Sequence, residues 1–432
     1  MKHRLKGLLA LVLSLVMVFA LATNAWAAVK IGGIELTSGV AFDGAQGTAT
    51  YDDTTKTLTL NGFEHECSGN GIESNENLTL QLLGDNKVES NSGGAGIFVD
   101  GGTLTIDGTG SLTASGTGSG IYAGNVTIES GKVTATGTNG DGISASVKVT
   151  ISGGNVTAEG GWDGIYAGDT VSISDGEVNA KGVYDGIIAS DKVTISGGNV
   201  TATGTGDDGR GISAYDVSIE NATVTAAGSA TDDGSGNVTY GGEYGIYSSH
   251  TGNSSGGEVV IKNSTVTAKA GADGTGIRVE GVIGETIIQN STVDIGCETG
   301  INSNYVAILA DSSVTIKSTD KAISCSGLSF ADVTDPALSD STWYKWSTNG
   351  TAFTLSTATE LTKEITAGTS TLYVVPLSAN TNPYPPFIYN PTPTPEPEKV
   401  DSAKTFDGGI GLYVTMSVLS ATGSAFLFKK KD

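Results

Sequence analysis

Reactive and metal-binding side chains are scarce in this chain of 432 residues. It contains three cysteines and three histidines. Three cysteines can form at most one disulfide, so the chain is not a disulfide-stabilised scaffold. No metal-ligand spacing joins Cys67, Cys297 and Cys325. The sequence therefore excludes disulfide frameworks and cysteine-based metal sites, and favours small apolar packing roles for these thiols.

Basic residues are also scarce. The chain has 23 Lys and Arg against 46 Asp and Glu, which gives a formal net charge of -23. An acidic surface repels the phosphates of nucleic acids and of anionic membranes, while it attracts divalent cations. The composition therefore predicts no nucleic-acid partner and permits a cation such as Ca²⁺.

Glycine is abundant, with 63 residues, and it marks a repeat. A Gly-Ile motif recurs along the chain, and three successive intervals between Ile121 and Ile187 are each 22 residues long. A fixed period of this length is typical of solenoid folds, in which each repeat packs on the next. The motif isoleucines are Ile72, Ile97, Ile121, Ile143, Ile165, Ile187, Ile212, Ile246, Ile277 and Ile301, with an Ala-Ile variant at Ile323.

One period contains three short strand patterns. In the period that starts at Gly142, residues 142–145 form the first and residues 147–151 alternate apolar and polar side chains. Residues 152–154 are a turn, and residues 155–158 form the third strand. About 22 residues leave no room for a crossover helix, so each period predicts one coil of a parallel β-helix. We expect Ile, Val and Ala inside and glycine in turns that need a positive φ.

The two ends of the chain carry membrane and export signals. Basic residues before an apolar run and a small-x-small site predict a signal peptide, with a retained membrane anchor as the alternative. Near the other end, residues 408–428 carry no charge and three lysines follow, which predicts a transmembrane helix; an apolar terminal strand is the alternative. The predicted segments are a signal peptide (1–27), cap strands (28–66), the parallel β-helix (67–330), a C-terminal cap (331–379), a Pro-rich stalk (380–407) and a transmembrane anchor with a basic tail (408–432).

This arrangement resembles Gram-positive surface proteins that are anchored by a sorting signal. The resemblance implies an exported protein that the C-terminal transmembrane segment holds at the bacterial cell surface. Those proteins carry Leu-Pro-x-Thr-Gly before the apolar span, whereas this chain has Thr405 with neither Leu-Pro before it nor glycine after it. Sortase cleavage and simple retention by the span are therefore both open.

Two rows of outward positions follow from the repeat. The turn row lies two residues before each motif isoleucine and contains Asp141, Asp163, Asp185 and Arg210 on successive coils. Coils lie ~4.8 Å apart, so neighbouring carboxylates repel by only about 1 kcal/mol in water. Ca²⁺ is held by such oxygens, and the three aspartates are thus candidate calcium ligands. The alternatives are ordinary Asp-Gly turn chemistry and catalysis.

Aromatic side chains accompany both rows. Trp162 and Tyr184 directly precede Asp163 and Asp185, while Tyr122 and Tyr166 belong to the strand row, one residue after each motif isoleucine. Aromatic faces beside polar groups suit a sugar chain. The alternatives are rings folded over the core and ordinary strand aromatics. The candidate carbohydrate-binding residues are Trp162, Tyr184, Arg210, Tyr122 and Tyr166.

The three-strand period over residues 50–330 resembles the right-handed parallel β-helix superfamily that includes pectate lyases and polygalacturonases. The chain is also similar to clostridial cell-surface carbohydrate-binding proteins, which implies binding of Ca²⁺ and acidic plant polysaccharide. The polygalacturonase motifs are absent apart from Asp207-Asp208, and Arg210 beside Asp185 is the one candidate lyase constellation. The fold predicted is all-β, a right-handed single-stranded parallel β-helix capped at both ends, with a C-terminal transmembrane helix.

The predicted function is that of a non-catalytic, adhesin-like surface protein that binds a plant or host polysaccharide, acidic or Ca²⁺-dependent in the finer version of the prediction. A polysaccharide lyase that acts on an acidic glycan is the first alternative. A structural or host-adhesion protein is the second. Membrane association is predicted through the C-terminal helix alone.

Overall fold

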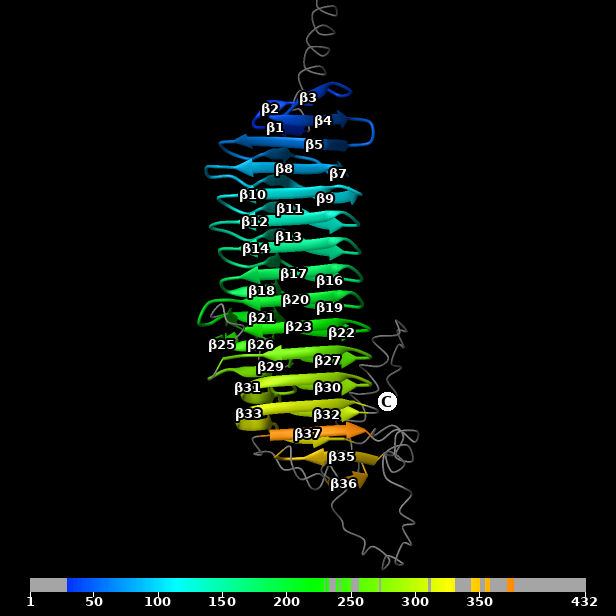
Figure 1. Ribbon diagram of the computed structural model, residues 1–432, viewed down its shortest axis with the longest axis vertical. Helices are drawn as coiled ribbons and strands as arrows, with labels where there is room; N and C mark the ends of the chain where they lie inside the picture. The colour runs from blue at the N-terminus through cyan, green and yellow to red at the C-terminus, as the bar shows by residue number, and fades with distance from the viewer. Residues whose placement is uncertain are drawn as a thin grey trace, which may run out of the picture. The chain divides into compact units, whose positions relative to one another are not determined.

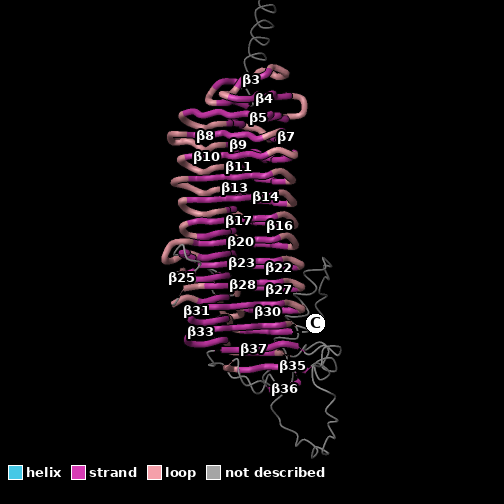
Figure 2. The backbone as a smooth tube through the Cα atoms, in the orientation of Figure 1, coloured by secondary structure: helices cyan, strands magenta, loops and turns pink. Residues whose placement is uncertain are grey.

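The computed structural model describes residues 29–228, 230–232, 238–240, 242–249, 256–271, 273–309, 312–330, 343–349, 354–357 and 371–376. These residues form strands and turns, and none of them lies in a helix (Figure 2). Contacts between Cα atoms divide the chain into two units, residues 1–171 with 175–180 and residues 172–174 with 181–432. The predicted all-β class is confirmed.

The first unit opens with antiparallel strands and continues as parallel coils (Figure 1). Its strands are β1 (Val29–Ile31), β2 (Ile34–Glu35), β3 (Ala41–Asp43), β4 (Gln46–Asp52), β5 (Thr57–Cys67), β6 (Ile72–Ser74), β7 (Leu78–Leu83), β8 (Asp85–Ser90), β9 (Ile97–Gly108), β10 (Ser111–Gly116), β11 (Ile121–Ile128), β12 (Lys132–Gly137), β13 (Ile143–Ile151), β14 (Asn155–Gly160) and β15 (Ile165–Ala167). Residues of both units occur in β16 (Thr170–Ile173) and β17 (Glu177–Gly182).

Strand β5 joins the cap of the first unit to its coils. It pairs antiparallel with β4, which pairs antiparallel with β3. It also pairs parallel with β7 and β8, so its backbone already has the direction of the repeats. The leucines of this strand, Leu58 and Leu60, are fully buried. The first parallel layer therefore starts at β5, on top of which the antiparallel strands lie.

The coils of the first unit stack with identical positions in register. Ile121 pairs with Ile97 on one side and with Ile143 on the other, and Ile143 pairs with Ile165. These motif isoleucines have no exposed surface. The predicted interior of Ile, Val and Ala is thus confirmed, and the fold is a β-solenoid. In β9, β11 and β13 the first two predicted strands of a coil run together as one, with a register shift after Ala123.

The second unit repeats this architecture and ends with antiparallel strands. Its strands are β18 (Asp185–Ala189), β19 (Lys192–Ile195), β20 (Asn199–Gly204), β21 (Arg210–Ala214), β22 (Asp216–Glu220), β23 (Thr223–Gly228), β24 (Ala230–Asp232), β25 (Val238–Tyr240), β26 (Tyr244–Ser248), β27 (Glu258–Lys262), β28 (Thr265–Lys269), β29 (Thr275–Val279), β30 (Glu285–Gln289), β31 (Thr292–Asn302), β32 (Tyr305–Leu309), β33 (Ser313–Ser324), β34 (Gly327–Ser329), β35 (Trp343–Ser347), β36 (Thr354–Thr357) and β37 (Thr371–Pro376).

Parallel pairing in the second unit again aligns the motif isoleucines. Ile187, Ile212, Ile246, Ile277 and Ile301 pair in sequence and are fully buried. Strand β33 then pairs antiparallel with β37, which pairs antiparallel with β35. Leu372 and Val374 of β37 are buried, so this strand covers apolar surface at the last coil. A solenoid needs such a cover because its terminal layer has no further coil to pack on.

Glycine serves two different purposes in the coils. The turn glycine Gly154 has a φ of +85°, as predicted for the turns. The motif glycine Gly142 has no positive φ, but a Cβ there would lie 2.6 Å from the Glu159 nitrogen and 2.8 Å from the Gly164 oxygen. The Gly-Ile motif therefore marks a close approach between backbones, in which a motif glycine such as Gly142 or Gly245 lies against the carbonyl oxygen of the motif glycine on the next coil.

A row of acidic residues runs up the coils of the second unit. Asp216, Glu258 and Glu285 pair in register on successive coils. Glu285 is 9% exposed, and burial together with the charge of Glu258 raises its pKa to about 7. Burial also raises the pKa of Asp216. These carboxyl groups oppose folding when they are ionised, because desolvation disfavours their charged forms.

The three cysteines are free thiols. Among the described residues there is no helix long and apolar enough to cross a membrane. The predicted signal peptide, stalk and transmembrane anchor at 408–432 lie outside the described residues.

Candidate functional site

The turn row of the first unit places Asp141 in the turn itself. Asp141 is 7% exposed, and its Oδ1 accepts a hydrogen bond from the backbone N–H of Asp163 at 3.3 Å. Burial raises the pKa of the Asp141 carboxyl group, while hydrogen bonds from Ser144 and from the Asp163 backbone lower it. This carboxylate therefore ties one coil to the next, which favours the turn-chemistry interpretation at this position.

Trp162, beside the half-buried Asp163, presents its ring to solvent. Its side chain is 57% exposed, while its backbone N–H donates to the carbonyl oxygen of Gly140 at 3.1 Å. A ring that covered the core would be largely buried. The exposure therefore favours a contact surface over a lid, because the backbone is fixed and the indole remains available.

The strand row of the first unit is aligned as predicted, although Ser144 is buried against Asp141 and is not outward-facing. Phe98, Tyr122, Ser144 and Tyr166 pair in register on successive coils. The rings of Phe98 and Tyr122 stack with their centroids 5.2 Å apart and an interplanar angle of 10°. The hydroxyl groups of Tyr122 and Ser146 share a hydrogen bond of 2.9 Å. The sheet thus fixes the aromatic rings of Phe98, Tyr122 and Tyr166 in one row, with the hydroxyl group of Ser146 beside Tyr122.

In the second unit, Tyr184 and Arg210 lie in neighbouring turns of successive coils. Tyr184 is 57% exposed, and its carbonyl oxygen accepts a hydrogen bond of 2.8 Å from the backbone N–H of Arg210. The Arg210 guanidinium has its Nε 3.9 Å from Oδ1 of Asp185, which is 5% exposed. Its Nη1 donates to Ser213 at 3.3 Å, and its Cζ lies 4.7 Å from the ring centroid of Tyr247. Arg210 is therefore held from several sides.

Sequence reasoning did not single out a pair of tyrosines in β26. The rings of Tyr244 and Tyr247 stack with centroids 4.7 Å apart and planes 9° apart, and the Tyr244 hydroxyl donates to Glu243 at 2.6 Å. Tyr244 belongs to the turn row and Tyr247 to the strand row of one coil. The sequence signal for this stacked pair is thus the presence of an aromatic residue in both the turn row and the strand row of one period.

The described residues contain no group of three or more His, Cys, Asp or Glu placed to hold a metal ion. Asp141 is buried and engaged in the turn, and Asp185 faces Arg210. A calcium ion takes six to eight oxygen ligands, so one bound at this turn would also need oxygens from the polysaccharide or from water.

The fold and these rows of exposed aromatic and polar side chains describe a β-solenoid with an extended contact surface. The chain belongs to the family of carbohydrate-binding domain-containing proteins, whose model matches residues 37–274, more than half of its length. The match contains every candidate residue of the turn row and the strand row named above. No curated protein and no solved structure matches the chain.

Proposed function

We propose that this protein binds a polysaccharide along the turn and strand rows of its coils, as a non-catalytic protein displayed on a bacterial surface. The observation that carries the proposal is the exposure of two aromatic rings, Trp162 and Tyr184, each at 57%. Each ring directly precedes an aspartate of the turn row. The proposal includes the right-handed coil, which is the hand that connections between parallel strands adopt.

The chemistry of the rows supports a sugar chain as the ligand. Pyranose rings present apolar C–H faces that pack on aromatic rings, and hydroxyl groups that need hydrogen-bond partners. The first unit offers the stacked rings of Phe98 and Tyr122, together with the exposed hydroxyl group of Ser146, on adjacent coils. A linear polymer that runs across the coils meets the same kind of position at each layer, ~4.8 Å apart.

The test is binding of the full chain to a glycan array, followed by calorimetry with the strongest ligand. Trp162→Ala and Tyr184→Ala are each expected to weaken binding by about tenfold, or 1.4 kcal/mol, because exposed aromatic anchors carry a large share of such interfaces. Val147→Ala is the matched control, since Val147 is an apolar residue with 46% exposure in the first unit. Binding that is unchanged in both aromatic variants would overturn the site.

The finer proposal is that the protein binds an acidic glycan through calcium, so that acidic-glycan binding depends on the cation. A chain of net charge -23 repels a polyanion, so an acidic polysaccharide needs a bridging cation. We therefore expect EDTA to abolish binding of polygalacturonate, and added Ca²⁺ to restore it, with Asp163→Asn reducing the effect of calcium. Binding of neutral polysaccharides is expected to be insensitive to EDTA. Polygalacturonate binding that survives chelation would remove calcium from the proposal.

A further inference from the structure

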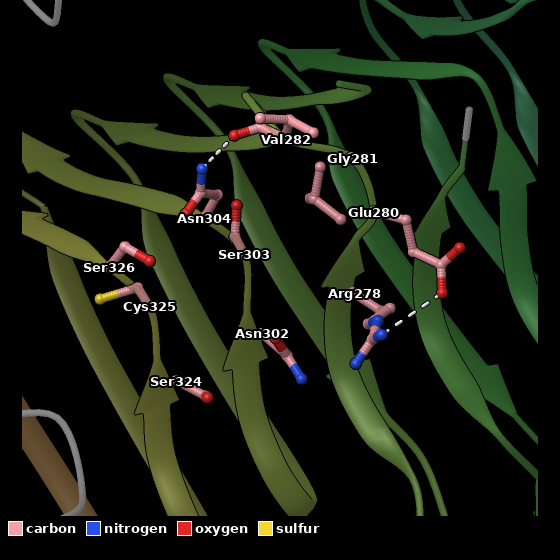
Figure 3. A pocket seen from close by; sticks show the side chains of 11 residues that line it. Arg278, Glu280, Gly281, Val282, Asn302, Ser303, Asn304, Ser324, Cys325 and Ser326 are labelled. Atoms are coloured by element: carbon pink, nitrogen blue, oxygen red, sulfur yellow. Dashed lines mark hydrogen bonds and ion pairs between the residues drawn. The ribbon is translucent and has the colours of Figure 1, made fainter. Parts of the chain in front are cut away.

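A polar groove lies in the second unit, beyond the last residue of the family match. It encloses about 710 Å³ and is lined by three short segments from successive coils (Figure 3). The lining segments are residues 278–282, 302–304 and 324–326. The match ends at residue 274, so the family resemblance assigns nothing to this groove.

The groove continues the strand row. Tyr247, Arg278, Asn302 and Ser324 pair in register on successive coils. Figure 3 shows Arg278, Asn302 and Ser324 at corresponding places on adjacent strands. Within the second unit, the strand row thus passes from the aromatic ring of Tyr247 to hydrogen-bonding side chains on the following coils.

Hydrogen-bonding capacity in the groove is only partly used. Arg278 Nη2 donates to Glu280 Oε1 at 3.3 Å, and Asn304 donates its amide N–H to the carbonyl oxygen of Val282. Arg278 Nε is buried without a hydrogen-bond partner. Within the described chain, the side chains of Asn302 and Ser324 make no hydrogen bond. That nitrogen is closed to solvent, but the Arg278 side chain is 32% exposed and its guanidinium carries five N–H donors, so its Nη groups can donate to a ligand oxygen in the groove.

We propose that this groove is a subsite for an uncharged sugar residue of the polysaccharide, a proposal that rests on the proposed function. The amide of Asn302 both donates and accepts, as a sugar hydroxyl group does, while the Nη groups of Arg278 donate and Ser324 does either. Glu280 offsets the charge of Arg278 at 3.3 Å. The groove therefore offers an anionic sugar no net charge to pair with, and selects hydroxyl groups.

Cys325 gives this proposal a direct readout because its thiol lines the groove. The full chain is alkylated with iodoacetamide, with and without xylohexaose, cellopentaose, mannohexaose or trigalacturonate, and each cysteine is followed by peptide mass spectrometry. We expect at least one of the neutral oligosaccharides to slow alkylation of Cys325 in proportion to the fraction of protein bound. The rate at Cys67, in the first unit, is expected to stay unchanged. Protection by trigalacturonate alone, or by none of the four, would overturn the proposal.

Variants of Asn302 separate the groove from the rest of the surface. Asn302→Ala and Asn302→Asp are each expected to abolish the protection of Cys325, whereas the exposed Thr292→Ala in β31 is expected to retain it. The aspartate keeps the shape of the side chain, so it guards against a folding defect, and thermal unfolding confirms that each variant folds. If the chain binds glycans on the array and Cys325 stays protected in both Asn302 variants, the subsite in the groove is refuted while the proposed function stands. If the unmodified chain binds no glycan on the array, the proposed function is refuted as well.

Discussion

Glu285→Gln is expected to stabilise the protein at pH 8 by roughly 2–3 kcal/mol, with little effect at pH 4. The pKa of Glu285 is raised from 4.5 to about 7 by burial and by the charge of Glu258 on the neighbouring coil. Its other neighbour in register, Tyr305, provides no positive charge. The folded state therefore holds a proton that the unfolded chain releases near pH 4.5.

The sign of the pH dependence follows from this raised pKa. Stability is fully present below the unfolded pKa of about 4.5 and is lost as the pH rises through about 7. The midpoint of urea unfolding, measured from pH 4 to pH 8, should fall in the unmodified protein and fall less in Glu285→Gln. Some decline remains in the variant because the pKa of Asp216 is raised as well. Glu220→Gln is the control, since Glu220 is an exposed carboxylate of the same unit. Equal slopes for all three proteins would contradict the prediction.

Gly142→Ala is expected to destabilise the first unit by about 3 kcal/mol, at the upper end of the cost of overpacking. The added Cβ would lie 2.6 Å from the Glu159 nitrogen and 2.8 Å from both the Ala158 carbonyl carbon and the Gly164 oxygen. All three are backbone atoms of the sheet, so no side-chain rotation can relieve the contact. Thermal unfolding followed by far-ultraviolet circular dichroism measures the loss.

Gly296→Ala provides the matched control for this prediction. A Cβ at Gly296 meets no atom within 4 Å, and the residue has no positive φ. Alanine there is expected to leave stability unchanged or to raise it by up to about 1 kcal/mol, because it restricts the unfolded chain. A similar loss in both variants would show that the close approach at Gly142 has no special cost.

The fold was predictable because the same sequence pattern recurs in every period, so each coil gives the same indication of strands and turns. Ile121, Ile143 and Ile165 occupy the same position in successive periods, and parallel pairing brings them into register. The same alignment correctly placed Asp185 beside Arg210 and aligned Tyr122 with the outward row. Local turns and inward stacks were thus readable from spacing alone, and the family match agrees with the carbohydrate-binding prediction.

The spacing of the repeat did not predict how deeply each side chain of a row is buried. Asp141 and Asp163 hold the same position of the turn row on successive coils, yet Asp141 is 7% exposed while Asp163 is only half-buried. The difference comes from the backbone N–H of Asp163, which captures the carboxylate of Asp141. The groove at Arg278 and Asn302 was missed for a related reason. Arg278, Asn302 and Ser324 are members of the strand row, but the loop residues that complete the groove, such as Glu280 and Asn304, follow no repeat.

The contact between motif glycines has a consequence for how such a protein can grow. Each of these glycines lies against the carbonyl of its counterpart, as Gly142 does with Gly164, and Gly245 does with Gly276. A shift of register would bring a side chain to that contact, so extra residues are accommodated outside the paired positions, as between Ile212 and Ile246, which are 34 residues apart and still pair. Each added coil brings one more position of each row. Avidity for a long polymer is then set by the number of layers, and it can change without altering any single contact.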